Sequence, residues 1–500
     1  MLHSYELCSI GYLFTINTIY FYFTIVGFLE MLRHRFITSE RDEVGSPDSG
    51  SVTSSLESSV LVPPVSIIAP AYNEEATVCE SVQAMLSLQY PEFEVIVVND
   101  GSKDRTMERL INRFHLYRSA RYFDQNIPGK PIRAVYESMD GLPLVVVDKD
   151  NGGKADSLNA GINISRYPLF CGVDADSLLE RHALVRIAEP FIQDPEKVLA
   201  VGGIIRVVNG CTVTEGCIEK IGLPDSWIAR FQVVEYFRAF LGGRVALSSF
   251  NSLLVISGAF GIFQKAAVMA VGGYKTDTVG EDMELVVRLH HWARKAKRPY
   301  RIVFQPDPVC WTEVPESLMI LRRQRNRWQR GTIETIWRHR VMMMNPRYGA
   351  LGLIAFPYFV AFEMCGPLVE IVGVVITLLG LWLGLVDSKA AYLFFTISVM
   401  YGVLLSTAAI LLEEMSLRRY STVGSLITLI VAGVVENFGF RQLLTLWRAQ
   451  AFIDVWQGKG GWGVMERKGF QPAVTTPVAD NPAVPASSLG GSVASAKTRA

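Results

Sequence analysis

LFCGVDADSLLE, residues 169–180, decides the fold class, because an apolar run ends there in two aspartates one residue apart. Apolar runs of this length are typical of buried strands in parallel sheets. Side chains at i and i+2 lie on one face of a strand, so Asp174 and Asp176 are expected to point into one crevice at the strand end. Ser177 and Glu180 have the spacing of a capping box, which predicts a helix directly afterwards.

Outward from this stretch, strand-like and helix-like segments alternate. The strand-like runs are VSIIAP (65–70), EVIVVND (94–100) and LPLVVVD (142–148), and the helical segments are 75–88, 104–116 and 154–162. Such alternation predicts a doubly wound α/β domain with a mostly parallel sheet and ligands at the carboxyl ends of its strands.

Composition limits the class of protein further. Lys plus Arg and Asp plus Glu are 48 each, so no net charge points to nucleic acid. Half of the residues are hydrophobic, which indicates a soluble domain joined to membrane spans. The seven cysteines are scattered without a CxxC pair, as expected for free thiols in a reducing compartment.

The amino-terminal region predicts a membrane anchor over residues 1–34. Residues 7–29 carry no charge and are long enough to cross a hydrocarbon core of about 30 Å. Arginines follow the run but none precedes it, which places the amino terminus outside and the next domain in the cytoplasm. Neither a basic start nor a small-residue cleavage site marks a signal peptide. The Ser-rich residues 35–64 are predicted to be a linker.

The remaining boundaries follow from the return of apolar sequence after Arg347. Residues 65–347 are predicted to form the catalytic domain with interfacial helices. Residues 348–448 contain three or four transmembrane helices, and a cytoplasmic carboxyl terminus requires four. We expect a basic cytoplasmic segment over 449–470 and disorder over 471–500. The apolar runs are 349–362, 371–386, 390–412 and 422–435.

Three of the predicted strand ends carry groups that suit a nucleotide. Two carboxylates at one rim, as at Asp174 and Asp176, suit Mg²⁺ or Mn²⁺ shared with substrate phosphates. In NDGSKD (99–104), Asp100 suits a base or ribose, and in NGGKADSLNAG (151–161), Lys154 near a helix start suits a phosphate. Taken singly, the D-x-D pair and the Gly-Gly-Lys stretch are more typical of an ordinary turn or loop, and NDGS is equally typical of a turn and of a site.

Two further motifs suit the chemistry of transfer. GEDMELVVRLHHWARK (280–295) predicts a helix whose Asp282 serves as a general base if Glu281, Glu284 or desolvation raises its pKa. The alternative is that these acids only complement the helix dipole.

QRNRW (324–328) places Gln324, Arg327 and Trp328 on one helix face, where Arg suits a diphosphate and Trp a sugar ring. The alternative for this motif is a basic amphipathic helix on the membrane surface.

The order of these motifs resembles the processive family 2 glycosyltransferases, which include cellulose, hyaluronan and poly-N-acetylglucosamine synthases. The resemblance runs from about residue 65 to 331 and rests on PAYNE, NDGS, GKADSLNAG, D-x-D, ED and QxxRW. It extends weakly into GKGGWGVMERKGF (458–470). It implies a GT-A catalytic domain, a nucleotide-diphosphate sugar donor and a metal-dependent, inverting hexosyl transfer.

The resemblance also implies roles residue by residue. Asp100 would contact the uridine and Lys154 would lie near the nucleotide, with Asp174 facing the donor and Asp176 binding the metal. Tyr72 and Glu74 in PAYNE would join the nucleotide-sugar site. Asp282 matches the base, and the diphosphate and acceptor site matches Gln324, Arg327 and Trp328. The family often has Thr-Glu-Asp, whereas this chain has Gly-Glu-Asp at 280–282.

The sequence therefore predicts a multi-pass cell-membrane enzyme with a cytoplasmic catalytic domain. We expect it to transfer sugar from UDP-N-acetylglucosamine or UDP-glucose to a growing β-linked polysaccharide and to export the product. One alternative is a non-processive transferase acting on a lipid acceptor. A second, of another class, is a non-catalytic membrane transporter or scaffold.

Overall fold

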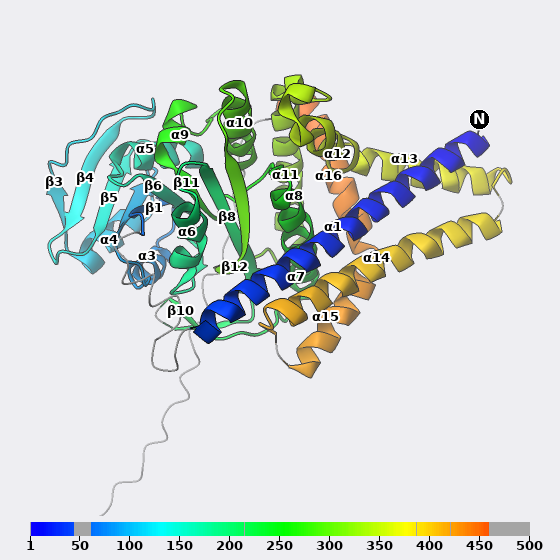
Figure 1. The fold of residues 1–500 in the computed structure, drawn as a ribbon, viewed down its shortest axis with the longest axis horizontal. Coiled ribbons are helices and arrows are strands. Elements are labelled where there is room, and N and C mark those ends of the chain that lie inside the picture. Colours follow the sequence, from blue (N-terminus) through cyan, green and yellow to red (C-terminus); the bar gives the residue numbers. More distant parts are fainter. Residues whose placement is uncertain (1, 45–61, 215, 387, 421, 460–500) are drawn as a thin grey trace, which may run out of the picture.

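The computed structural model describes residues 2–44, 62–214, 216–386, 388–420 and 422–459. The predicted tail and most of the weak carboxyl-terminal match lie outside this range. Figure 1 shows a sheet domain on one side and long helices extending from it on the other. The amino-terminal helix α1 (Leu2–Val44) runs ten residues beyond the predicted anchor and into the predicted linker.

A ten-stranded mixed sheet forms the centre of the catalytic domain, in the order β3-β4-β5-β2-β1-β6-β11-β8-β12-β7. Its parallel block is β5-β2-β1-β6, which confirms the four strands predicted from their apolar runs. β11 runs antiparallel between β6 and β8, and β8 is parallel to β12. The strands of the parallel block are β1 (Val65–Ala71), β2 (Phe93–Asn99), β5 (Leu144–Lys149) and β6 (Leu169–Val173).

Antiparallel neighbours complete the sheet at its edges, and a separate hairpin, β9–β10, lies apart from it. The other strands are β3 (Leu116–Ser119), β4 (Ile132–Ser138), β7 (Leu178–Leu179), β8 (Val198–Val207), β9 (Thr212–Thr214), β10 (Cys217–Lys220), β11 (Phe260–Gln264) and β12 (Arg301–Thr312). Every residue of β6 and β8 is buried, as expected for strands covered on both faces.

The helices of the catalytic domain include all those expected from helical spacing. They are α3 (Val78–Leu86), α4 (Thr106–Phe114), α5 (Lys154–Ile164), α6 (Ala183–Gln193), α7 (Trp227–Phe237), the π-helical η1 (Arg238–Arg244), α8 (Val245–Ser249), α9 (Lys265–Ala270), α10 (Glu281–Lys295) and α11 (Leu318–Arg338).

The predicted capping box after the second aspartate is wrong. Leu178 and Leu179 form β7, which pairs with β12, and the next helix begins only at Ala183. The Glu180 carboxylate accepts hydrogen bonds from Trp311 Nε1 at 3.3 Å and from Arg419 Nη2 at 2.9 Å. Pairing with a distant strand therefore prevails over the local capping signal, which cannot report on such contacts.

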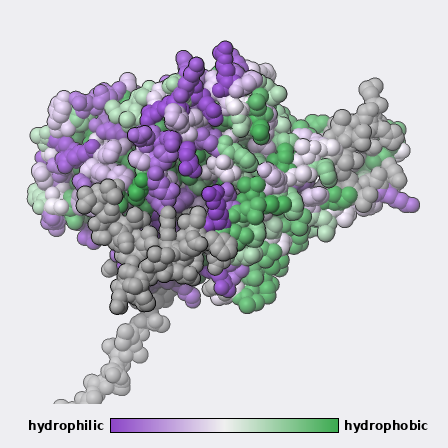
Figure 2. All heavy atoms as spheres, in the orientation of Figure 1, coloured by the Kyte–Doolittle hydropathy of each residue, from purple (hydrophilic) through white to green (hydrophobic). Residues whose placement is uncertain are grey.

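The carboxyl-terminal region forms a helical bundle beside α1. Its elements are η2 (Arg340–Met342), η3 (Pro346–Tyr348), η4 (Leu351–Ala355), α12 (Phe356–Tyr358), η5 (Phe359–Met364), α13 (Gly366–Trp382), α14 (Ser388–Ser416), α15 (Val423–Val435) and α16 (Phe440–Trp456). Hydrophobic residues gather on the surface over α14 and α15, whereas hydrophilic ones prevail over the sheet domain (Figure 2).

Two described helical segments, 14–33 and 395–416, are long and apolar enough to cross a membrane. Two bent pairs, 351–364 with 366–382 and 423–435 with 440–456, would raise the number to four if each pair is one span. The last pair includes α16, which crosses the predicted boundary at residue 448. α13 and α14 extend with α1 away from the sheet, while α15 and α16 run across them (Figure 1).

Candidate active site

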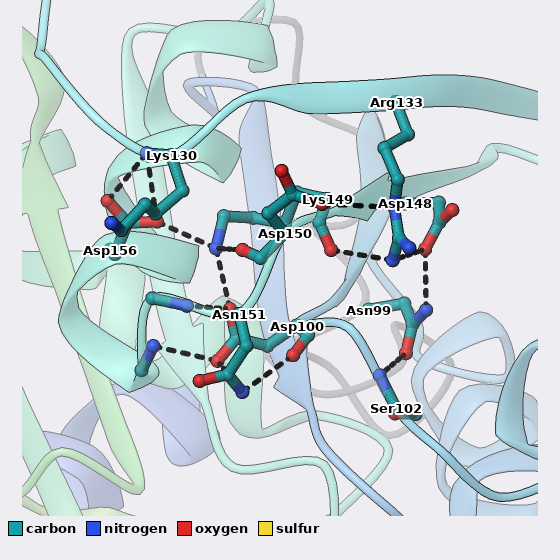
Figure 3. Close-up of polar contacts among 12 residues, drawn as sticks. Asn99, Asp100, Ser102, Lys130, Arg133, Asp148, Lys149, Asp150, Asn151 and Asp156 are labelled. Carbon is teal, nitrogen blue, oxygen red and sulfur yellow. Dashed lines mark hydrogen bonds and ion pairs between the residues drawn. The ribbon is translucent and has the colours of Figure 1, made fainter.

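The loop that joins β5 to α5 is held by the carboxylate of Asp100, which is buried at the end of β2. Asp100 Oδ1 accepts hydrogen bonds from Lys149 Nζ at 2.5 Å and from the Gly152 N–H at 2.9 Å. Oδ2 accepts from the Gly153 N–H at 2.8 Å and from Asn151 Nδ2 at 3.1 Å. Figure 3 shows these donors converging on the carboxylate. Both oxygens of Asp100 are thus used to shape this loop.

Lys149 is a site residue that the sequence reasoning missed. Its side chain is fully buried, and Nζ lies 2.5 Å from Asp100 and 2.6 Å from Asp156 (Figure 3). Asp156 in turn accepts a hydrogen bond from the Lys130 N–H at 3.1 Å. A lysine at the end of an otherwise apolar strand was the available signal, because buried lysines are rare unless paired.

Three residues predicted to bind the nucleotide sugar lie outside the central cavity. Tyr72 is exposed, and the Glu74 carboxylate accepts a hydrogen bond from Thr77 at 3.0 Å. Asp100 is buried beneath the loop it holds. The structure therefore places these three just after the carboxyl ends of β1 and β2, and they are not among the residues that line the cavity.

The other seven predicted site residues line one cavity of about 1320 Å³, which continues into the helical bundle. They come from four places in the chain: the start of α5, the end of β6, the start of α10 and the middle of α11. The seven are Lys154, Asp174, Asp176, Asp282, Gln324, Arg327 and Trp328.

Lys154 connects Asp174, directly after β6, to the α10 side of the cavity. Its ammonium forms an ion pair with Asp174 and donates to the Gly258 carbonyl at 3.1 Å. Burial alone would lower the pKa of Lys154, but the carboxylates of Asp174 and Glu281 raise it above its usual value. The side chain therefore carries a positive charge where a phosphate would arrive.

The predicted base, Asp282, is held at the start of α10. Oδ2 accepts a hydrogen bond from the Gly258 N–H at 3.2 Å, and Oδ1 accepts from the Met283 N–H at 2.8 Å. The two bonds fix the orientation of the carboxylate at the cavity. Gly258, in the turn before β11, was missed because a Ser-Gly pair before a strand is ordinary loop sequence.

Of the two neighbouring acids, only Glu281 shares this cavity. Burial raises the pKa of Glu281 to about 7, with Lys154 opposing the shift and Asp282 adding to it. Glu284 points elsewhere, since its carboxylate accepts hydrogen bonds from Arg288 at 2.8 Å and lies 3.2 Å from His339 Nε2.

The QxxRW residues, Gln324, Arg327 and Trp328, lie on α11. The indole ring of Trp328 lines the cavity and is partly exposed. The Arg325 guanidinium lies 4.2 Å from the centre of that ring and donates to Glu235 at 2.8 Å. Gln324 Oε1 is buried and has no hydrogen-bond partner within the described chain. Gln324 also lines the cavity, and a buried polar atom without a partner is costly.

α16 packs along α11. Arg322 donates to Gln450 at 2.6 Å and Asn326 donates to Asp454 at 2.8 Å. The polar face that suggested the membrane-surface alternative is therefore turned partly towards another helix.

The resemblance implied a threonine where this chain has Gly280, and the structure gives a steric reason for the glycine. A Cβ on Gly280 would lie 2.7 Å from Gly331 Cα, and one on Gly331 would lie 2.8 Å from Gly280 Cα. α10 and α11 thus touch through two glycines, between Asp282 and Trp328 in the fold. A threonine at 280 has no room here, and the nearby hydroxyl is that of Thr278, which donates to Glu334 at 2.8 Å.

A divalent metal fits the aspartates at the end of β6 only as a site shared with substrate. Within the described ranges, no group of three or more His, Cys, Asp or Glu side chains is gathered around one point. Mg²⁺ often takes one or two carboxylates and completes its shell with phosphates and water. Asp174 is paired with Lys154, so its carboxylate would have to share or exchange that partner in order to bind a metal.

Comparison with known proteins identifies this constellation. The model of the family "Glycosyltransferase like family 2" matches residues 63–331, which contain every predicted site residue. The chain belongs to this family. The match also confirms the GT-A-like class that the resemblance implied for the α/β domain.

Family 2 relatives of similar sequence are bacterial synthases. The poly-beta-1,6-N-acetyl-D-glucosamine synthase of Staphylococcus aureus (strain COL) is 29% identical over 300 residues, 59% of this chain and 61% of that protein. The Staphylococcus epidermidis protein of the same name is 30% identical over 275 residues, 55% and 56% of the two chains. This chain thus spans less than two thirds of the length of these relatives.

Among solved structures, a mannosyltransferase from Pyrobaculum calidifontis in complex with GDP-mannose and Mn²⁺ matches with a TM-score of 0.48 and 17% identity. The match covers 85% of this chain and 99% of that one.

Proposed function

We propose that the protein is a membrane-embedded, inverting glycosyltransferase that extends a β-linked polysaccharide from a UDP-sugar. The observation that carries the proposal is the single cavity that joins the α10 and α11 residues to the helical bundle. At its outer end it is lined by α13 and α14, at residues such as Leu378 and Tyr392. A growing hydrophilic chain needs such a path, and the names of the relatives make UDP-N-acetylglucosamine the first donor to test.

In the proposed reaction an acceptor hydroxyl attacks the anomeric carbon of the donor sugar from the face opposite the diphosphate. Asp282 takes the hydroxyl proton as the new C–O bond forms. The bond from the anomeric carbon to the diphosphate oxygen breaks, and its electron pair leaves with the nucleoside diphosphate. The position of Asp282 suits this role, because two backbone hydrogen bonds hold its carboxylate in the cavity.

The leaving diphosphate acquires charge, and cationic side chains stand ready for it. Lys154 and Arg327 line the same cavity as Asp282. Their charges would stabilise the departing group without reorganisation during the reaction. Mg²⁺ or Mn²⁺ held by Asp176, with Asp174, would supply further neutralisation of the diphosphate.

Tyr72 and Asp100, which follow β1 and β2, fit a supporting role in the binding of the nucleotide sugar. Asp100 would act by fixing the loop before Lys154, and the exposed ring of Tyr72 would flank the nucleotide. A cytoplasmic placement of this domain in the cell membrane agrees with the charge pattern around α1 and with UDP-sugars as donors.

A non-processive transferase acting on a lipid is the second candidate. The outer part of the cavity favours it, because Leu378, Tyr392 and Phe395 are apolar and more than half exposed. A lipid acceptor could enter between α13 and α14, whereas a polysaccharide would pass along the cavity.

The test uses the full chain in lipid vesicles with Mn²⁺ and labelled UDP-N-acetylglucosamine, UDP-glucose or UDP-galactose. We expect polymer from UDP-N-acetylglucosamine, resolved by gel filtration after lipid extraction. A product confined to a single-sugar lipid adduct would support the second candidate. No consumption of any donor would refute both, and Asp282→Asn provides the inactive control.

A further inference from the structure

Arg244 stands apart from the other arginines of the cavity. Arg238 is paired with Glu436, and Arg325 with Glu235. For Arg244 no hydrogen bond or ion pair is found within the described chain, and its Nη1 is a buried nitrogen without a partner. Its guanidinium lies 4.0 Å from the centre of the Phe240 ring, which holds the side chain but satisfies none of its donors.

Its position comes from an irregularity in the backbone. η1, the π-helical segment Arg238–Arg244, interrupts an otherwise continuous run of helix between α7 and α8. Each extra residue in a π-turn rotates the following side chains by about 100° relative to an α-helix. Such turns are frequent at functional sites. Here the turn ends at Arg244, which lines the cavity together with Asp282.

The charge of Arg244 persists although the residue is enclosed. Burial lowers its pKa to about 10, and the carboxylate of Asp282 opposes that change. The guanidinium therefore stays positive at neutral pH near the proposed base. The side chain as a whole is half-buried, but Nη1 itself is buried and has no partner within the described chain. A buried donor without a partner costs free energy, which favours a ligand that accepts a hydrogen bond from this nitrogen.

The elements around η1 indicate which ligand arrives there. η1 packs against α1, so closely that a Cβ on Gly27 would lie 2.4 Å from the Leu241 carbonyl oxygen. Thr24 and Tyr20 of α1 line the same cavity. Lys154 and Asp176, which are proposed to bind the nucleotide-sugar donor, come instead from the sheet domain. Arg244 therefore belongs to the wall that faces the bundle, where the acceptor end would lie.

We propose that Arg244 binds the terminal sugar of the acceptor by donating hydrogen bonds to ring or hydroxyl oxygens adjacent to the attacking hydroxyl. Bonds to neighbouring oxygens orient the nucleophile without occupying the lone pair that attacks. This role rests on the proposed function and assigns Arg244 to acceptor positioning, separate from Lys154 and Arg327 at the diphosphate.

The experiment compares Arg244→Gln and Arg244→Lys with the wild type in nanodiscs, using UDP-N-acetylglucosamine and N-acetylglucosamine oligomers as acceptors. Two rates are followed: sugar transfer, and hydrolysis of the donor by water, which needs no bound acceptor. We expect Arg244→Gln to lower kcat/KM for the acceptor by about 10- to 100-fold. The donor KM and the hydrolysis rate should stay within about twofold, and Arg244→Lys should retain an intermediate transfer rate.

Arg298→Gln is the matched control, because this guanidinium also lies over an aromatic ring, Trp292 at 5.8 Å, but outside the cavity. A parallel rise in donor KM and UDP inhibition constant for Arg244→Gln would assign the residue to the diphosphate and overturn the inference. Unchanged transfer would also overturn it. A wild type that consumes no donor would refute the proposed function itself, and equal gel-filtration profiles exclude misfolding.

Discussion

The loop that Asp100 holds, called the donor side here, and the cavity wall formed by η1 and α11, called the acceptor side, differ in how their polar groups are satisfied. On the donor side, both oxygens of Asp100 are bonded to the chain's own Lys149, Asn151 and loop N–H groups. On the acceptor side, Gln324 Oε1 and Arg244 Nη1 have no partner in the described chain. The donor loop is therefore complete before any ligand binds, whereas the opposite wall holds donors and acceptors for a ligand to satisfy.

The difference follows from how each side is assembled. The donor loop is built within the sheet domain, where Asp100 after β2 binds Lys149 of β5 and the N–H groups that precede α5. The acceptor wall brings together η1, α10 and α11, which contact α1 and α16 from the two ends of the chain. A preformed loop lowers the cost of binding a nucleotide. A wall with unused polar atoms gains its full interaction energy only when substrate is present.

The strongest test removes the group that joins the two sides. Asp282→Asn should lower transfer about 10³-fold, because an amide cannot accept the hydroxyl proton. UDP binding, measured by isothermal titration calorimetry, should stay within about twofold. Asp277→Asn, which alters an exposed carboxylate paired with Arg338, is the control and should transfer normally. Wild-type turnover in Asp282→Asn would contradict the base assignment.

Replacing Lys149, the cation at the centre of the donor loop, tests how much the hydrogen-bonded loop contributes to stability. Lys149→Met leaves two buried carboxylates without their shared partner, and we expect a loss of about 3–5 kcal/mol in the free energy of unfolding. Denaturant unfolding of the detergent-solubilised protein measures the loss. Arg133→Met, which breaks the half-exposed pair with Asp148, should cost at most about 1 kcal/mol. Equal effects of the two substitutions would show that the buried network contributes no more to the free energy of unfolding than the half-exposed ion pair does.

Metal-dependent binding separates the two aspartates of β6. Asp176→Ala should weaken UDP binding in the presence of Mn²⁺ by about 10- to 100-fold, and binding in EDTA should change little. Asp174→Ala should have the smaller metal-dependent effect, since this carboxylate is already paired with Lys154. Titration calorimetry with and without Mn²⁺ measures both. The reverse order would assign the metal to Asp174.

The glycine contact between α10 and α11 tests how accurately the acceptor wall must be placed. Gly331→Ala puts a Cβ within 2.8 Å of Gly280 Cα, so the two helices must separate. We expect transfer to fall roughly tenfold with unchanged UDP affinity, because small displacements of reacting groups are costly. Gly424→Ala, with nothing within 4 Å of the new Cβ, should be silent. Normal transfer in Gly331→Ala would show that the spacing is not critical.

The smallest expected effect concerns the proton on Glu281. Its pKa rises from 4.5 to about 7 on folding, so between these values the folded chain retains a proton that the unfolded chain has lost. Stability should therefore fall as pH rises through this window. Glu281→Gln should raise Tm by a few degrees at pH 8 and have little effect at pH 4.5. Exposed Glu219→Gln is the control, and a benefit greatest at acid pH would contradict the assignment.

Much of the fold was predictable from local pattern. Short Val, Ile and Leu runs predicted the buried strands of the parallel block. Helical spacing predicted α3, α4, α5 and α10. β11 was not predicted, because a strand of five residues beginning with Phe260 has no distinctive period. The Ser177–Glu180 signal failed because β7 gains more by pairing with β12 than by capping a helix.

The sequence by itself determined which chemical groups this protein brings to a nucleotide sugar, since the type and order of the motif residues are local properties. It could not determine which of those groups face substrate. Only the tertiary structure decided that Asp100 holds the loop before α5, that Gly280 must be small beside Gly331, and that Arg244 lines the cavity. Each depends on contacts between residues distant in the chain, and these contacts leave no periodic trace in the sequence.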